Sequence, residues 1–194
     1  MNLEDIKAKI EKALAGVSLK TVRESLLIEK PSDLPKVVQF LKEDPDLRLD
    51  YLSSVTGADY LTFLESVYHL YSIEKKGPGL TLRVRADRNN PRIPSLVSIY
   101  RGAEFQEREA FDMYGIVYEN HPDLRRIFMW DGFQGYPLRK DYEQEDSETL
   151  EMEDIDWLRR NKVQVPDEMT AQAEKLKQEG KRAIAQRPGE TEPQ

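Results

Sequence analysis

The sequence predicts an α+β fold, a two-layer sandwich of a mixed sheet with helices, plus an extended C-terminal tail. Helix-like and strand-like segments occur out of strict alternation, which argues against a doubly wound α/β fold. A Gly-Pro-Gly turn at residues 77–79 joins two strand-like segments as a hairpin, and the pattern of elements dissolves beyond Pro137. We therefore expect a folded domain over residues 1–142 and an acidic, extended tail over residues 143–194 that packs on a partner.

The first part of the chain is expected to form two helices with one strand between them. Apolar residues recur at helical spacing over residues 3–14. Residues 19–28 are rich in β-branched and aliphatic side chains and are closed by Pro31, which favours a strand. Asp33 can cap a second helix, which Pro45 ends.

Three strand-like segments follow, at residues 48–56, 62–73 and 80–86. The third alternates between apolar and polar residues, as expected of a sheet with one solvent-facing side. Pro94 can begin a helix that runs to Tyr114.

The chain is expected to leave this helix at Gly115, where a left-handed residue is typical. Residues 116–118 are expected to be extended. The aromatic run at residues 128–142 is interleaved with Gly and Pro and is too irregular for a helix or a strand. Loops this rich in aromatic rings stay soluble when another surface covers them. Alternating charges at residues 171–185 are compatible with one further helix.

The composition excludes several classes of function. The chain has no cysteine, so thiolate nucleophiles, zinc fingers and cysteine-bound iron–sulfur clusters are excluded within it. The net charge of -7 argues against sequence-independent binding of nucleic acid. Eight acidic residues and no basic one fall in residues 143–156, so the acidity belongs to one segment. We expect neither a signal peptide nor a membrane span, because no apolar stretch has the necessary length.

Residues that could perform chemistry concentrate between positions 107 and 142. Glu109 and Asp112 lie three apart on one expected helix face, and His121 with Asp123 could supply a base and its orienting carboxylate. The same residues could bind a metal, although the two histidines of the chain lack H-x-x-H spacing.

A structural interpretation of this block is also open, and we favour it. Glu104 and Arg108 have the spacing of a helical ion pair, and the helix carboxylates could pair with arginines of the following loop. The basic pairs Arg125-Arg126 and Arg139-Lys140 could bind phosphate, but without a glycine-rich loop salt bridging is the simpler expectation.

The block resembles a known family. Residues 107–109 read E-R-E, and fixed spacings then lead to Asp112, His121 and Arg125, with an apolar pair after the aspartate and another after the loop arginines. This pattern is similar to the subunit designated C in the proton-pumping NADH:quinone oxidoreductase, respiratory complex I. The resemblance continues to Tyr142 and covers roughly residues 1–142. The chain has Asn where members often have Gly, and Tyr where they often have His, at Asn120 and Tyr136.

The resemblance implies a structural subunit of the peripheral arm of a respiratory-chain enzyme. That enzyme passes electrons from NADH through FMN and iron–sulfur clusters, held by partner subunits, to quinone, and couples this to proton transport. The implied partners are chiefly the quinone-site subunit, designated D, and its neighbour, designated B. The implied location is a peripheral membrane complex on the cytoplasmic face of the bacterial inner membrane. The isolated chain is expected to be inactive and to hold no cofactor or metal.

The resemblance leads to a working hypothesis for the charged residues. Glu107, Glu109 and Asp112 would pair with Arg125 and Arg126, so that the end of the domain and the tail meet the partner. The candidate structural and interface residues are Glu107, Arg108, Glu109, Asp112, His121, Asp123, Arg125, Arg126, Arg139, Lys140, Asp141 and Tyr142.

Three alternatives stay open at this point. The chain could be the equivalent subunit of a related membrane-bound hydrogenase or ferredoxin-linked complex. It could be a free-standing hydrolase that uses Glu109, Asp112 and His121. It could also be an adaptor whose acidic run binds basic proteins, which predicts salt-sensitive binding.

Overall fold

The chain divides into two compact units, residues 1–142 and residues 143–194. A computed structural model gives the structure. It describes residues 2–130, 132–142, 152–160, 162, 164, 165, 167, 169–171, 173–175, 177 and 178.

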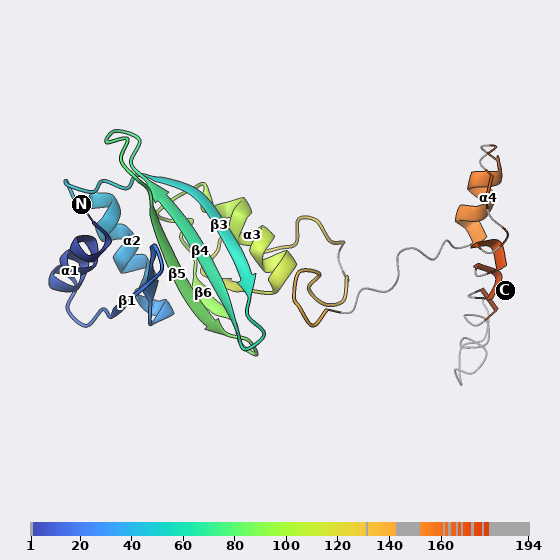
Figure 1. Ribbon diagram of the computed structural model, residues 1–194, viewed down its shortest axis with the longest axis horizontal. Coiled ribbons are helices and arrows are strands. Elements are labelled where there is room, and N and C mark those ends of the chain that lie inside the picture. Colours follow the sequence, from blue (N-terminus) through green and yellow to red (C-terminus); the bar gives the residue numbers. More distant parts are fainter. Residues whose placement is uncertain are drawn as a thin grey trace. The chain divides into compact units, whose positions relative to one another are not determined.

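A five-stranded mixed sheet forms one layer of the first unit, with strand order β1-β2-β5-β4-β3 (Figure 1). Strands β2 and β5 run parallel, and every other neighbouring pair in this sheet is antiparallel. The strands are β1 (Leu19–Val22), β2 (Ser25–Ile28), β3 (Tyr51–Asp59), β4 (Phe63–Tyr71) and β5 (Leu80–Asp87).

Helices provide the second layer. Helices α1 (Leu3–Ala13) and α2 (Leu34–Glu43) lie beside the β1 end of the sheet, and α3 (Ala103–Tyr114) lies beside β3 (Figure 1). Their buried apolar residues form one core cluster with the apolar residues that alternate along β5. The predicted α+β fold with a mixed sheet and helices is therefore confirmed, and so is the predicted alternation of the third strand-like segment.

Two predicted elements differ from the structure. Residues 19–28 form two antiparallel strands, because Arg23 has a φ of +55° and the chain reverses between β1 and β2. Residues 92–94 form the short strand β6 (Arg92–Pro94), so Pro94 ends a strand and does not begin a helix. Helix α3 begins only at Ala103, after a turn.

The exit from α3 follows the prediction. Gly115 has a φ of +74° and ends the helix in the left-handed conformation. Strand β7 (Val117–Glu119) follows and pairs in parallel with β6. Asn120 then adopts a φ of +63°, which Asn tolerates better than most other residues. These two positive-φ positions turn residues 120–142 back along α3.

The second unit contains helix α4 (Met152–Arg160), which the sequence analysis did not predict. Two arginines in its last turn interact favourably with the negative, C-terminal end of the helix dipole. The side chain of Ile155 is buried. The described residues between 167 and 178 are helical, and the rest of the helix expected at 171–185 lies outside the described residues. Within the described part of the chain, no helix has the length and apolar character that crossing a membrane requires.

Candidate functional site

Asp112 on α3 organises the loop that follows β7. Its Oδ2 accepts hydrogen bonds from the backbone amides of Ile127, Phe128 and Met129 at 3.0, 2.7 and 3.0 Å. Its Oδ1 lies 2.9 Å from a guanidinium nitrogen of Arg126. Burial would raise the pKa of this carboxyl, but the three amides and the guanidinium together lower it below its ordinary value. The predicted pair of Asp112 with Arg126 is therefore present.

Arg126 extends this anchor into the aromatic run. One of its guanidinium nitrogens donates to the carbonyl of Gly135 at 3.0 Å. The guanidinium also lies over the rings of Phe133 and Tyr136, 5.6 and 5.3 Å from their centroids. A single side chain thus joins α3 to both halves of the loop, with cation–π contacts added to its hydrogen bonds.

Arg108 fastens the same loop from one turn earlier on α3. Its guanidinium donates to the carbonyls of Arg125 at 3.1 Å and Arg126 at 3.3 Å, and lies 5.4 Å from the ring centroid of Phe105. The predicted helical ion pair with Glu104 is wrong, because the loop carbonyls occupy the guanidinium instead. The planar fork of arginine suits two neighbouring acceptors of this kind.

His121 is a structural residue of the loop. Its Nδ1 accepts the amide of Asp123 at 3.0 Å, so its Nε2 donates to the carbonyl of Glu104, also at 3.0 Å. Asp123 pairs with Arg125 at 2.9 Å, and this partner holds the pKa of Asp123 below its ordinary value. Arg125 therefore pairs within the loop and not with a carboxylate of α3, which corrects the hypothesis for this residue.

Glu107 also departs from the hypothesis. It is fully buried, and its carboxylate accepts hydrogen bonds from the hydroxyl of Ser95 at 2.6 Å and the amide of Leu96 at 2.7 Å. Burial raises its pKa to about 7. Glu109 is exposed and forms no ion pair with any residue that the structure describes. Of the three helix carboxylates, Asp112 alone makes the predicted pairing with a loop arginine among the described residues.

The last residues of the first unit are held against α3 and the sheet. Arg139 donates to the carbonyl of Tyr114 at 2.7 Å, and its guanidinium lies 4.6 Å from the ring centroid of Tyr136. The ring of Tyr142 stacks on that of Phe133 with centroids 6.0 Å apart. The predicted basic pair Arg139-Lys140 thus contributes one side chain to the fold, while the Lys140 side chain is exposed.

A second anchor at the end of the sheet was missed by the sequence analysis. Asp59, at the end of β3, pairs with Arg88 and accepts the amide of Lys140 at 2.8 Å. Arg88 also binds Asp141 at 2.5 Å. Although burial raises the pKa of Asp59, Arg88 and the backbone amides of Lys140 and Leu61 lower it to about 2. No local sequence pattern predicts these contacts, because the residues that make them come from three distant segments of the chain.

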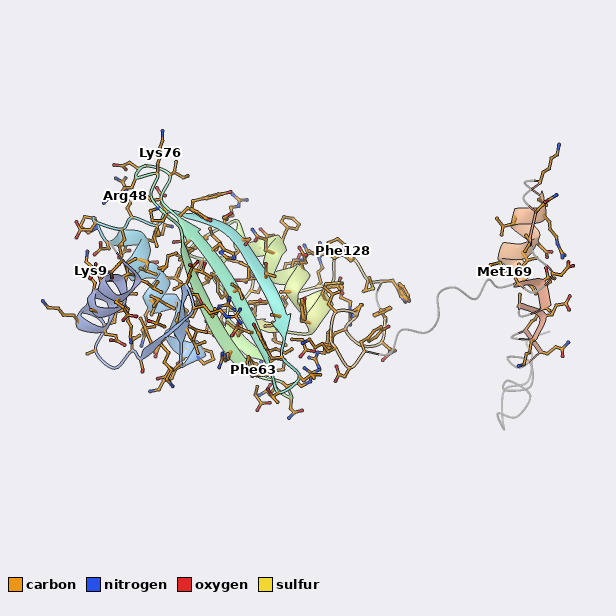
Figure 2. The ribbon with its side chains drawn as sticks, viewed as in Figure 1. Lys9, Arg48, Phe63, Lys76, Phe128 and Met169 are labelled. Carbon is orange, nitrogen blue, oxygen red and sulfur yellow. The ribbon has the colours of Figure 1, made fainter. Side chains whose placement is uncertain are left out.

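These anchors leave large apolar side chains in solvent. Phe128 projects from the loop beyond the end of α3 (Figure 2). Arg108 joins Phe105 to the loop, and we call the exposed residues of α3 and the loop the α3-loop surface. Its exposed apolar members are Phe105, Ile127, Phe128, Trp130 and Leu138.

The geometry does not assemble a catalytic centre from the predicted residues. No hydrogen bond or ion pair joins any two of Glu109, Asp112 and His121 in the described part of the chain. Within the part of the chain that the structure describes, no group of three or more His, Asp or Glu side chains could hold a metal ion. A groove of about 650 Å³ lies between the start of α1, β1 and the β4–β5 loop, and it is lined by other residues.

Comparison with known families gives a match over most of the first unit. The family described as "Respiratory-chain NADH dehydrogenase, 30 Kd subunit" matches residues 27–148. This range begins within β2 and contains β3, β4, β5, α3 and the whole fastened loop.

Curated relatives carry a related name. The chain is 44% identical over 116 residues to the NADH-quinone oxidoreductase subunit designated C 2 of Rhizobium meliloti. The matched region covers 58% of this chain and 62% of that relative. It is 39% identical over 142 residues to the subunit designated C of the same enzyme in a Roseiflexus species, with 72% and 80% covered. It is 44% identical over 153 residues to the equivalent subunit of Burkholderia multivorans, with 72% and 76% covered.

Two solved structures are also similar. The trypsin-resistant fragment of Nqo5 has a TM-score of 0.49 and 28% identity, covering 64% of this chain and 100% of the fragment. A chain of an archaeal membrane-bound sulfane sulfur reductase has a TM-score of 0.57 and 24% identity, covering 72% and 85%. The second likeness concerns the fold alone.

Proposed function

We propose a function on the premise that the chain belongs to the family of the respiratory-chain NADH dehydrogenase 30 kDa subunit, whose match spans more than half of its length. The chain is the subunit designated C in NADH-quinone oxidoreductase, respiratory complex I, and serves electron transport in the respiratory chain as a structural component. The relatives reported above carry this name, which favours complex I over a hydrogenase or a ferredoxin-linked complex.

The chain takes no direct part in electron transfer in this proposal. FMN and the iron–sulfur clusters belong to partner subunits, and the absence of cysteine from the sequence is consistent with that division of roles. Each candidate residue that binds another group does so within the fold, as Asp112 binds three loop amides. We infer that these residues maintain shape and perform no catalysis.

The α3-loop surface is the docking site for the partner. The observation that carries this proposal is the contrast between a rigidly anchored loop and the apolar side chains it leaves exposed, such as Phe128 at 60% and Trp130 at 68%. Exposed apolar patches of this kind mark protein interfaces. The partners are chiefly the quinone-site subunit, designated D, and its neighbour, designated B. The complex lies peripherally on the cytoplasmic face of a bacterial inner membrane.

Purification from native cells tests the assignment. The chain is tagged, membranes are solubilised in mild detergent, and the co-purifying proteins, flavin and iron are identified. We expect one large assembly with flavin and iron that reduces quinone with NADH. An assembly with nickel and no flavin would assign the chain to a hydrogenase. A lone protein would contradict the structural role and would return Glu109, Asp112 and His121 to consideration as catalytic residues.

A charge reversal at Arg126 distinguishes a structural role of this residue from a catalytic one. Arg126→Glu places a carboxylate beside Asp112, so we expect the amount of assembled complex to fall while turnover per assembled complex is retained. Arg125→Glu is the matched control, because the Arg125 side chain is 69% exposed and its ion pair is with its neighbour Asp123. Normal assembly of Arg126→Glu with lost turnover would contradict the structural role of this residue.

A surface variant tests docking without disturbing the fold. Phe128→Ser combined with Trp130→Ser removes exposed apolar area from the α3-loop surface, and we expect a stable chain that assembles poorly. Ile73→Ser is the control, because Ile73 is 65% exposed but lies after β4, outside this surface. Equal assembly of the two variants would contradict the proposed docking site.

A further inference from the structure

Glu107 is a buried carboxyl without a cationic partner among the described residues. Its side chain is inaccessible to solvent, and its two hydrogen-bond donors are the neutral Ser95 hydroxyl at 2.6 Å and the Leu96 amide at 2.7 Å. In the part of the chain that the structure describes, no Lys, Arg or His forms an ion pair with it. Burying an ionised carboxylate with so little compensation is costly, so such groups tend to take up a proton.

The surroundings of Glu107 hold other titratable groups, but these are uncharged phenols. Tyr68 on β4 and Tyr118 on β7 both face the carboxyl, and burial raises the pKa of each above its ordinary value. The hydroxyl of Tyr118 lies 2.6 Å from the Ser66 hydroxyl. The hydroxyl of Tyr68 has no hydrogen-bond partner among the described residues. Among the other charged residues of α3, Arg108 and Asp112 are engaged with the loop, Glu104 is half-buried and Glu109 is exposed.

The hydrogen bonds of the site can accommodate either protonation state. Ser95 donates to an ionised carboxylate, and its hydroxyl can rotate to accept from a protonated one. The Leu96 amide can donate to Oε1 in both states. The Ser95 oxygen also accepts the amide of Val97 at 3.2 Å, which fixes the local backbone around it. Proton binding therefore requires no rearrangement of the chain.

We propose that Glu107 is a buried proton-binding site, hydrogen-bonded to residues 95–97, whose protonation state sets the stability of the folded first unit. These residues lead into the turn before Ala103, where α3 begins. A charged carboxylate in this enclosure opposes its own burial, which destabilises the folded state relative to the unfolded chain. A neutral carboxyl removes that opposition. The proposal concerns the interior of the first unit and does not depend on the partner or the enzyme.

The direction of the pH effect follows from the pKa. Burial raises the pKa of Glu107 from 4.5 to about 7, so the folded chain binds this proton more tightly than the unfolded chain does. The contribution of the group to stability is fully present below the unfolded pKa of 4.5. It is lost as the pH rises toward and through the folded pKa of about 7.

Urea unfolding of the full-length chain at two pH values tests the proposal. Between about pH 5 and about pH 8, we expect the unfolding equilibrium constant of the wild type to rise on the order of fiftyfold more than that of Glu107→Gln. Glutamine retains an acceptor for Leu96 and a polar group for Ser95. Glu109→Gln, an exposed carboxylate on the same helix, is the matched control and should follow the wild type. Identical pH dependence of the wild type and Glu107→Gln would overturn the proposal.

Infrared difference spectroscopy keeps the proposal testable even if Glu107→Gln fails to fold. In the folded wild type and in Glu109→Gln, we expect the carbonyl band of a protonated buried carboxyl to disappear as the pH rises, with a midpoint near the pKa of about 7. In a folded Glu107→Gln this band should be missing. A midpoint near 4.5, the ordinary pKa of a glutamate, would overturn the proposal, and the wild-type protein is sufficient for this measurement.

Discussion

Two carboxyl groups on α3 are equally inaccessible to solvent yet have opposite electrostatic character. Asp112 accepts three backbone amides and a guanidinium, and its pKa is lowered. Glu107 has one hydroxyl and one amide, and its pKa is raised. Neither is exposed to solvent, but Glu107 lies deeper in the interior and has fewer donors and no cationic one, and both differences raise its pKa relative to that of Asp112. A helix can therefore present a permanent charge and a proton-binding group five residues apart.

Asp112 and Glu107 perform two different tasks within one helix. Asp112 points its charge at the loop, and that charge holds residues 126–129 in place. Glu107 faces the interior and holds residues that precede the helix. The first interaction shapes the surface that we propose as the docking site, and the second belongs to the core. Substitutions at the two positions should therefore differ in size and in pH dependence.

The largest effect is expected for Asp112→Ala. The change leaves three loop amides and the guanidinium of Arg126 without their common acceptor, so we expect a loss of about 3–5 kcal/mol in the free energy of unfolding. Urea unfolding of the full-length chain measures it. Glu109→Ala on the exposed side of α3 should stay within about 0.5 kcal/mol of the wild type. A loss below about 1 kcal/mol would show that Asp112 does not organise the loop.

The contribution of Asp59 to stability should depend on pH in the same direction as that of Asp112 and in the opposite direction to that of Glu107. Its pKa is lowered from 3.8 to about 2, so its contribution is present above pH 3.8 and is lost as the pH falls toward 2. We expect this contribution to be about 2 kcal/mol at neutral pH. Asp59→Asn should remove that part of the acid sensitivity in unfolding experiments. Unchanged acid sensitivity in this variant would show that the ionised Asp59 carboxylate does not stabilise the fold.

A smaller effect is expected where the chain leaves α3. Gly115 adopts a left-handed backbone, and a Cβ there would meet the ring of Tyr136 at 2.5 Å. Gly115→Ala should therefore cost roughly 1–2 kcal/mol from the backbone conformation alone, with further cost if the ring cannot shift. Thermal unfolding measures it. Gly132→Ala is an informative companion, because Gly132 also has a positive φ but no atom lies within 4 Å of its added Cβ.

The smallest effect is expected for the exposed pair of Asp123 with Arg125. Both side chains are largely in solvent, at 49% and 69% exposure, so solvent screens their attraction. Arg125→Met should leave the urea midpoint unchanged within the error of the titration. A clear loss of stability here would mean that the loop depends on surface pairing as much as on the buried anchor.

The sequence allowed prediction of features that depend on local pattern. The alternation of β5, the left-handed Gly115 and the presence of a carboxylate–arginine bond between α3 and the loop all follow from spacing and residue type. The β1–β2 turn was missed because Arg23 adopts a positive φ without the usual Gly or Asn. Helix α4 was missed because the acidic composition around it indicates disorder more than helix.

Features that depend on tertiary contacts could not be predicted in this way. The sequence placed Ser95 inside an expected helix, whereas in the structure it lies before α3 and binds Glu107. Asp59, Arg88 and Asp141 come together from separate segments, and nothing in their local sequence pairs them. The partner of a buried charge is a property of the whole fold, so residue type alone predicted the wrong partner for Glu107.

Photo-crosslinking in native cells tests most directly the claim that the loop anchored by Asp112 joins this chain to its complex. A photoreactive phenylalanine analogue replaces Phe128 on the α3-loop surface and, in a separate strain, Ile73 outside it. We expect the analogue at position 128 to crosslink to the quinone-site subunit and the analogue at position 73 to give background only. Crosslinks to that subunit from position 73, with none from position 128, would contradict the account.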